Sequence, residues 1–131
     1  MDSAEKSKYW WDLSDYDIVT AEAMLQTGRW LYVGFMCHQS VEKALKAYWC
    51  AKQPENDPPY QHNLFRLVQG AGLEHQMSED QLDFIDGLTP LNIEARYPSY
   101  KEKLLKNMTP DYCKNLISKT KELLSWIRNR H

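Results

Sequence analysis

Apolar residues recur at intervals of three or four positions along three long stretches of the chain. In the first, residues 4–27, the recurring positions are Trp11, Ser14, Ile18, Ala21 and Leu25. In the second, residues 31–52, they are Leu31, Phe35, His38, Val41, Leu45 and Tyr48. In the third, which begins at Pro110, they are Cys113, Leu116, Ile117, Thr120, Leu124 and Ile127. Positions at this spacing share one side of an α-helix, so we predict three long amphipathic helices.

Glycine and proline mark where these helices end and begin. Gly28 follows the first helix directly, and glycine readily adopts the left-handed conformation that terminates helices. Residues 53–60, QPENDPPY, combine three prolines with Asn and Asp, so we expect a loop after the second helix. Thr109 followed by Pro110 is typical of an N-cap and a first helical position, and predicts the start of the last helix.

Shorter helices are expected between these long ones. We predict one over residues 62–70 and another over residues 78–86, where Ser78 and Gln81 have the spacing of a capping box. Neither segment has the length of the three long stretches. We therefore expect both to cap or extend the bundle that the long helices form.

Prolines interrupt the segment that precedes the last helix. Pro90 and Pro98 lie within residues 89–108, so we expect short helical pieces there, joined by a bend at Tyr97–Pro98. No useful stretch of the sequence alternates apolar and polar residues with a period of two. The sequence thus predicts an all-α fold, an antiparallel up-and-down bundle of about five helices, three of them long, in a single domain over residues 1–131.

The composition is that of an ordinary soluble globular domain. Hydrophobic residues make up 43% of the 131 residues and charged residues 26%. The N-terminal residues MDSAEKSK lack the apolar core of a secretory signal, and charges interrupt every long helix, so we expect no membrane span. Three cysteines without a C-x-x-C spacing favour reduced thiols and a cytoplasmic location.

The sequence offers little for metal or cofactor chemistry. None of the four histidines pairs with another histidine or a cysteine at ligand spacing, so no metal site is predicted. Neither a glycine-rich nucleotide loop nor a nucleophile elbow is present, and we expect no cofactor. Cys37 and His38 are adjacent, but successive helical positions point about 100° apart, so the two side chains would not meet.

A row of polar residues runs along the second helix. His38, Glu42 and Lys46 are spaced four residues apart and lie beside the apolar stripe. One interpretation is a half-buried packing seam in which Glu42 pairs with Lys46 or with a charge on a neighbouring helix. The other is a functional row that lines a cleft. Asp17 of the first helix is the candidate partner for this row under either interpretation.

Four segments together resemble a known family. They are DIVTAEAML at residues 17–25, FMCHQSVEKALK at 35–46, HNL at 62–64 and ARYP at 95–98. In these segments the chain resembles the HEPN family, named for the higher eukaryotes and prokaryotes nucleotide-binding domain. The resemblance implies an antiparallel bundle of about five helices that commonly forms a homodimer. It also implies a possible partner, because many members form a toxin–antitoxin pair with a minimal nucleotidyltransferase.

The family's best-known activity is metal-independent RNA cleavage by an arginine and a histidine separated by four to six residues. Such a pair is chemically reasonable, because histidine acts as acid and base on the ribose hydroxyl while arginine stabilises the phosphate charge. No histidine stands at the permitted distance after Arg29, Arg66 or Arg96, and Arg128 and Arg130 stand too near the last residue. We therefore predict no catalytic residues by this route, and a binding or interaction module for a nucleotide, RNA or a partner nucleotidyltransferase.

The segment that carries the family's arginine still suggests a ligand site. Arg96, Tyr97, Tyr100, Lys101 and Lys103 interleave cations with aromatic rings, which suits contacts to a nucleotide or RNA. The structural alternative is that Arg96 anchors the bend at Pro98 by pairing with an acid such as Glu94 or Glu42. The functional alternative is a divergent ribonuclease toxin in which His38 or a tyrosine replaces the missing histidine.

Overall fold

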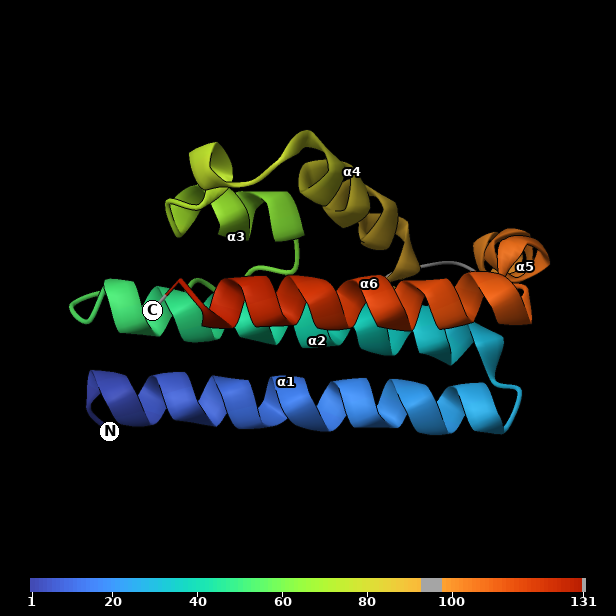
Figure 1. Ribbon diagram of the computed structural model, residues 1–131, viewed down its shortest axis with the longest axis horizontal. Helices are drawn as coiled ribbons and strands as arrows, with labels where there is room; N and C mark the ends of the chain where they lie inside the picture. Colours follow the sequence, from blue (N-terminus) through green and yellow to red (C-terminus); the bar gives the residue numbers. More distant parts are fainter. Residues whose placement is uncertain (93–97, 131) are drawn as a thin grey trace.

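The chain folds into a bundle of α-helices that runs along one axis of the molecule (Figure 1). The computed structural model describes residues 1–92 and 98–130. The α-helices in these ranges are α1 (Ser3–Gln26), α2 (Trp30–Lys52), α3 (Leu64–Gly70), α4 (Glu79–Leu88), α5 (Pro98–Asn107) and α6 (Pro110–Arg128). Two short 3-10 turns accompany them, η1 (Glu74–Gln76) and η2 (Thr89–Leu91). No strand occurs in the described residues, and the predicted all-α class is confirmed.

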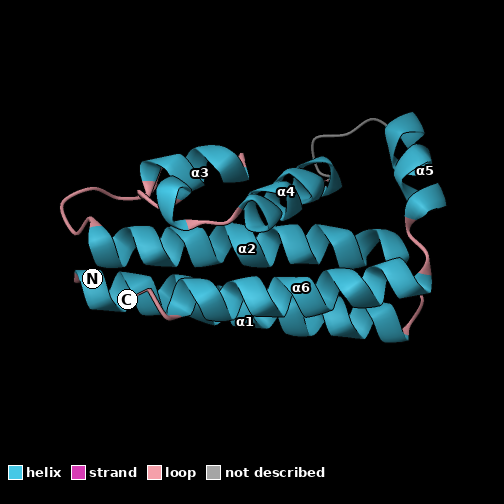
Figure 2. Cartoon of the chain, turned by 45° about the horizontal axis from the view of Figure 1, so that its top comes forward, coloured by secondary structure: helices cyan, strands magenta, loops and turns pink. Residues whose placement is uncertain are grey.

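The helices follow an up-and-down course. Figure 1 shows α1 antiparallel to α2 and α6, with α3 and α4 in a second row above them. α3 and α4 together lead the chain back toward the end where α2 began, so they take the place of one long third helix (Figure 1). α6 then runs back beside α2. Figure 2, turned toward the upper row, shows α2 lying directly beneath α3 and α4.

The expected number of about five helices was slightly low. The additional helix is α5 (Pro98–Asn107), which the sequence predicted only as short pieces around a bend. Proline at position 98 is compatible with a first helical residue, because the missing N–H would be unpaired there. α5 stands at one end of the bundle (Figure 1), where it contacts α2.

Local signals in the sequence set the helix boundaries. Asp2 and Glu5 form a capping box at the start of α1, and Gly28 ends that helix with a φ of 71°, a conformation that glycine adopts at little cost. The side chain of Thr109 accepts a hydrogen bond from the backbone N–H of Tyr112, so the predicted cap of α6 is present.

α2 is the central helix of the bundle. It contacts α1, α3, α4, α5 and α6, and apolar side chains around its circumference are excluded from solvent. Val33, Cys37, Val41 and Leu45 are fully buried. The predicted stripe therefore describes only one of the faces that α2 buries. A helix surrounded in this way derives its stability from packing more than from intrinsic helix propensity.

Serine residues bring α1 close to α2. The Ser14 hydroxyl donates to the Ser40 carbonyl at 2.7 Å, and the Ser40 hydroxyl donates to the Ser14 carbonyl at 2.9 Å. Nearer the N-terminus, the Ser7 hydroxyl donates to the Ala47 carbonyl at 2.9 Å. These small side chains permit a short distance between the helices while satisfying their own hydrogen-bonding groups, which burial makes necessary. No helix within the described ranges is both long and apolar enough to cross a bilayer.

Gly34 of α2 is a site where added volume should destabilise the fold. A Cβ at this position would lie 2.7 Å from Met108 Cε and 3.1 Å from Leu91 Cδ1, and both of these side chains are buried. A Cβ at Gly87 of α4 would meet nothing within 4 Å. Gly34→Ala should be less stable than Gly87→Ala by about 1–3 kcal/mol, because only the substitution at Gly34 forces buried side chains to shift. Urea unfolding of the two variants measures the difference, and equal stabilities would contradict the tight packing around Gly34.

Candidate functional site

The predicted polar row lies inside the bundle. His38 is fully buried, and Glu42 and Lys46 are only 3% and 5% exposed. The backbone of α2 carries all three residues on one side, at the spacing that the sequence predicted. Buried ionisable groups need partners, because transfer of an isolated charge out of water costs several kcal/mol.

Glu42 is the residue that connects this row. Its Oε2 lies 3.2 Å from Lys46 Nζ on the next helical turn, and its Oε1 lies 3.0 Å from His62 Nδ1. The Lys46 ammonium also lies 5.2 Å from the ring centroid of Trp10 on α1, a cation–π distance. Both carboxylate oxygens of Glu42 are thus occupied, and the charge of Lys46 is balanced within the protein.

His62 is the solvent-facing end of this network. Its side chain is 48% exposed, whereas the carboxylate that holds it is buried. The residue lies in the segment between α2 and α3, next to Asn63, which caps α3 through its side chain. The ring also packs edge-on against Tyr60, with centroids 5.5 Å apart. A buried carboxylate that orients an accessible imidazole is a geometry suited to proton transfer.

Asp17 belongs to a separate ion pair. It is buried on α1 and pairs with Lys43 of α2. The structure therefore brings Asp17 to α2, but its partner is a lysine that the sequence analysis did not single out. Lys43 and Glu42 are neighbours in sequence, and successive helical positions point about 100° apart, so the two acids serve different sides of α2.

His62 is a site residue for which the sequence predicted no role. The residue belongs to the HNL segment of the family resemblance, but a histidine in a loop carries no periodic signal. Its contact with Glu42 joins positions 20 residues apart. Only the path of the loop between α2 and α3 reveals that contact.

The predicted nucleotide- or RNA-contacting segment is described only in part. Arg96 and Tyr97 lie outside the described residues, and Tyr100 lies in α5 with its side chain outside that description. Lys101 is half-buried and Lys103 is exposed on α5. The ligand contact remains a prediction, as does the alternative in which Arg96 pairs with Glu94 or Glu42.

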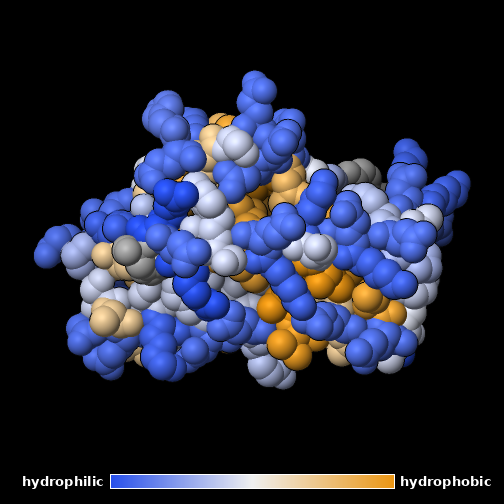
Figure 3. Space-filling view, viewed as in Figure 1, coloured by the Kyte–Doolittle hydropathy of each residue, from blue (hydrophilic) through white to orange (hydrophobic). Residues whose placement is uncertain are grey.

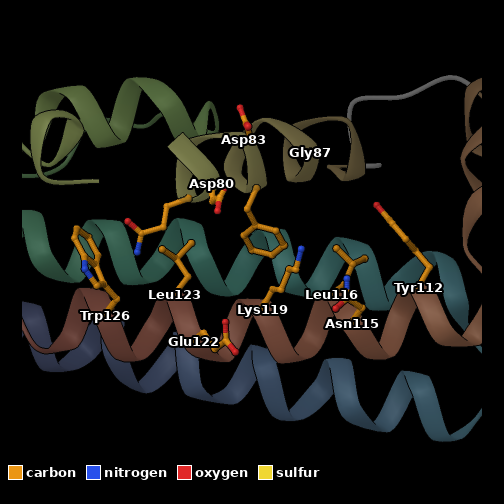
Figure 4. A pocket seen from close by; sticks show the side chains of 12 residues that line it. Asp80, Asp83, Gly87, Tyr112, Asn115, Leu116, Lys119, Glu122, Leu123 and Trp126 are labelled. Atoms are coloured by element: carbon orange, nitrogen blue, oxygen red, sulfur yellow. The ribbon is translucent and has the colours of Figure 1, made fainter. Parts of the chain in front are cut away.

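A groove that the sequence did not suggest runs between α4 and α6. It has a volume of about 820 Å³, with walls formed by α4 between Asp80 and Gly87 and by α6 between Tyr112 and Trp126. Figure 3 shows apolar surface between these helices, bordered by hydrophilic residues. In Figure 4, Leu123 and Trp126 point from α6 toward α4. The groove combines two helices that are distant in sequence, so no local pattern could reveal it.

The three cysteines are buried thiols. Burial raises the pKa of Cys37 to about 12, while a hydrogen bond with Thr120 acts in the opposite direction. Burial also raises the pKa of Cys113 and is the main cause of the raised pKa of Cys50. The thiol is a poor nucleophile compared with the thiolate, so these residues are unsuited to catalysis. No group of three or more potential metal ligands occurs among residues 1–92 and 98–130.

Comparison with known proteins identifies the fold. The family model described as HEPN domain matches residues 7–130. Among solved structures, the chain is similar to the crystal structure of TT1696 from Thermus thermophilus, with a TM-score of 0.80 and 17% sequence identity. The match covers 96% of this chain and 98% of that one. At this identity the similarity establishes a shared fold and no more. No curated protein matches the chain in sequence.

Breaking the buried Glu42–Lys46 pair by removing one partner should destabilise the fold. Glu42→Ala leaves the Lys46 cation buried without its carboxylate, and should cost about 3–5 kcal/mol of unfolding free energy. Replacing both residues by methionine should restore most of that loss, because no buried charge remains. The exposed pair of Lys8 and Asp12 has the same four-residue spacing, and Asp12→Ala should cost less than about 1 kcal/mol. Urea unfolding of wild type and these three variants tests this, and similar losses in Glu42→Ala and Asp12→Ala would contradict it.

The raised pKa of Cys37 should appear in the pH dependence of stability. The folded thiol ionises near pH 12 and the unfolded thiol near its ordinary value of 9.0. The folded state therefore holds the proton longer, so stability is fully present below pH 9 and falls as pH rises toward 12. Between pH 8 and pH 10, wild type should lose about 1.4 kcal/mol more than Cys37→Ala, in which other titrating groups are unchanged. Urea unfolding at the two pH values measures this loss, and parallel losses would refute the assignment.

Proposed function

The chain belongs to the HEPN domain family, and we propose that it serves as a binding and interaction module rather than as a ribonuclease. One observation carries this proposal: no histidine follows Arg29, Arg66 or Arg96 at the spacing of the family's nuclease motif. Without that pair, the usual acid–base group and its phosphate-stabilising partner are not combined. Binding, which needs only the surface around the former site, is the function that such a chain retains.

The burial of His38 supports this proposal. His38 was the histidine nominated as a substitute for the missing one, and it is fully buried in α2. A general base must come within hydrogen-bond reach of the proton it removes, about 2.6–3.2 Å between heavy atoms. A ring enclosed by the bundle has no such access to a ribose hydroxyl. The row of His38, Glu42 and Lys46 is better suited to organising the bundle.

The proposed ligand is a nucleotide or RNA that contacts α5 and the residues before it. Lys101 and Lys103 on α5 supply cations beside Arg96 in the sequence, while Tyr97 and Tyr100 supply rings for base stacking. A net charge of −2 over the whole chain suits a local contact of this kind better than extensive coating of nucleic acid. We further propose that the module is a cytoplasmic homodimer, and that its protein partner is a minimal nucleotidyltransferase of a toxin–antitoxin pair.

The pair of Glu42 and His62 favours a second candidate function, metal-independent RNA cleavage. Glu42 Oε1 contacts His62 Nδ1 at 3.0 Å, which leaves Nε2 as the nitrogen that would exchange a proton with a substrate. In this alternative His62, half-exposed and held by a buried carboxylate, takes the role that was considered for His38. The second function therefore makes a distinct prediction about which histidine matters.

Binding of labelled RNA separates the proposed module from its alternatives. A short fluorescently labelled RNA should bind wild type, and Lys101→Glu/Lys103→Glu should weaken binding by about tenfold or more at low salt. The control is Lys8→Glu/Lys114→Glu, which makes the same change in charge on exposed lysines of α1 and α6 and should bind nearly as well as wild type. Arg96→Ala should weaken binding as the α5 variant does. Anisotropy measures affinity, and equal weakening by the control would show only a general effect of charge.

Cleavage of the same RNA in the presence of EDTA decides between the two functions. We expect the RNA to stay intact with wild type, His38→Ala and His62→Ala. Cleavage by wild type that is lost in His62→Ala but retained with Asp12→Ala would establish the ribonuclease alternative. Sedimentation of the protein at tens of micromolar tests the proposed homodimer. A monomer at that concentration would contradict it.

A further inference from the structure

The groove between α4 and α6 has the form of a protein docking surface. We propose that it binds an amphipathic helix of a partner protein, with apolar residues of that helix on the groove floor and its Lys or Arg residues facing α4. The proposal is independent of the nucleotide or RNA contact at α5. It rests on the apolar floor, the length of the groove and the distribution of charge along its walls.

Apolar side chains from both helices form the floor. Leu116, Leu123 and Trp126 project from α6, and Phe84 lines the groove from α4. Figure 4 shows the three α6 side chains directed toward α4. Trp126 and Phe84 are only half-buried. The Arg130 guanidinium covers one face of the Trp126 ring at 4.3 Å from its centroid, so the remaining surface of that ring and part of Phe84 are available for contact. Leu116 and Leu123 are only 5% and 3% exposed, so the two aromatic rings are the anchors that a partner helix would contact.

The length of the floor matches a helix of several turns. Along α6 it extends from Tyr112 to Trp126, which corresponds to about 21 Å at the rise of an α-helix. A partner helix of about 15 residues spans this distance, with apolar residues recurring every three or four positions. The volume of about 820 Å³ admits one face of such a helix, while its other face remains in water.

The charge on α4 identifies the partner's chemistry. α4 carries four acidic residues and no basic one in ten positions: Glu79, Asp80, Asp83 and Asp86. None of the four forms an ion pair with another described residue, whereas Asp12, Asp15, Asp17 and Glu22 of α1 are all paired. Electrostatic complementarity at an interface mainly determines which partner binds. The unpaired acids of α4 therefore favour a partner helix with basic residues on the side that faces α4.

The helix dipole does not account for these acids. Glu79 and Asp80 lie in the first turn of α4, where a negative charge is favourable. Asp83 and Asp86 lie beyond that turn, and Asp86 approaches the end where a negative charge is unfavourable. In Figure 4, Asp80 extends toward α6 and Asp83 stands on the outer edge of α4. A partner helix in the groove would meet the Asp80 carboxylate directly, and Asp83, which points away from α6, would lie at the outer rim of that flank.

On the opposite wall, the charges nearly cancel. Lys119 and Glu122 line the groove from α6, and Figure 4 shows the Lys119 side chain reaching toward α4. The acidic excess therefore belongs to the α4 side, which orients a cationic helix with its basic flank toward α4. The same excess opposes a phosphate group, so the groove is unsuited to the nucleotide or RNA proposed for α5.

A second copy of the chain fits the groove less well. Its most basic helix is α5, but that helix has ten residues and reaches only about 15 Å. Its apolar positions are Tyr100, Leu104 and Leu105, which do not continue over a third and fourth turn. A separate protein with a longer amphipathic helix covers the floor more completely.

Two synthetic peptides of about 15 residues test the proposal. Both have leucines at the spacing i, i+3, i+7 and i+10, which follows the floor of the groove, and they carry either lysines or glutamates on the flanks. With isotope-labelled wild type, the lysine peptide should shift amide resonances of residues 79–88 and 112–126 in NMR spectra, and it should bind about tenfold or more tightly than the glutamate peptide. Trp126→Ala should weaken binding of the lysine peptide by about tenfold, because it removes an aromatic anchor.

Charge reversal gives the sharper test, because Asp80 and Asp83 are exposed and their substitution should leave the fold intact. Asp80→Lys/Asp83→Lys should reverse the preference and bind the glutamate peptide more tightly than the lysine peptide. The matched control, Glu55→Lys/Glu102→Lys, makes the same change in charge at two exposed acids away from the groove, and should retain the wild-type preference.

Four outcomes would overturn the proposal. They are no resonance shift with about 1 mM peptide, shifts centred on other helices, equal binding of the two peptides by wild type, and an unchanged preference in the charge-reversed variant. Sedimentation of wild type and of Asp80→Lys/Asp83→Lys tests whether a second copy of the chain occupies the groove. If wild type self-associates and Asp80→Lys/Asp83→Lys abolishes this, the occupant is another copy of the chain and the partner-helix proposal is wrong.

Discussion

A single buried carboxylate constrains the arrangement around the central helix. Glu42 is almost inaccessible to water, so its charge is tolerable only while Lys46 and His62 remain in contact with it. Through Lys46 the constraint reaches Trp10 of α1, and through His62 it reaches the segment that begins the second row of helices. Because Glu42 contacts both Lys46 and His62, the position of α1 and the path of the chain after α2 both depend on the Glu42 carboxylate.

This constraint separates structural chemistry from the surfaces that remain available for function. Glu42, Lys43 and Lys46 of α2 are paired within the protein, so we look to the outer helices for ligand contacts. α4 presents unpaired acids beside an apolar groove, whereas α5 presents lysines at one end of the molecule. The two surfaces have opposite chemistry, so a cationic protein segment and an anionic nucleotide or RNA need not compete for the same site.

Some features of the candidate site were predictable, because their signals are local. The row of His38, Glu42 and Lys46 follows from helical spacing, and so does a pair between Glu42 and Lys46 at four residues' distance. The contact of Glu42 with His62 was not predictable, since it depends on the loop that joins α2 to α3. The pairing of Asp17 with Lys43 was not predictable either. Lys43 is one residue after Glu42 and therefore lies on another face of α2 than the predicted row.

By itself, the sequence determined the class of fold, the three long helices and most of their ends, since periodicity, proline and capping residues act over a few positions. It also determined that no histidine follows Arg29, Arg66 or Arg96 at the spacing of the family's nuclease motif, which is a matter of spacing alone. Only the tertiary structure decided that His38 is enclosed while His62 is accessible, and that α4 and α6 form a groove. Burial depends on which helices pack around a residue, and in this chain those helices come from distant parts of the sequence.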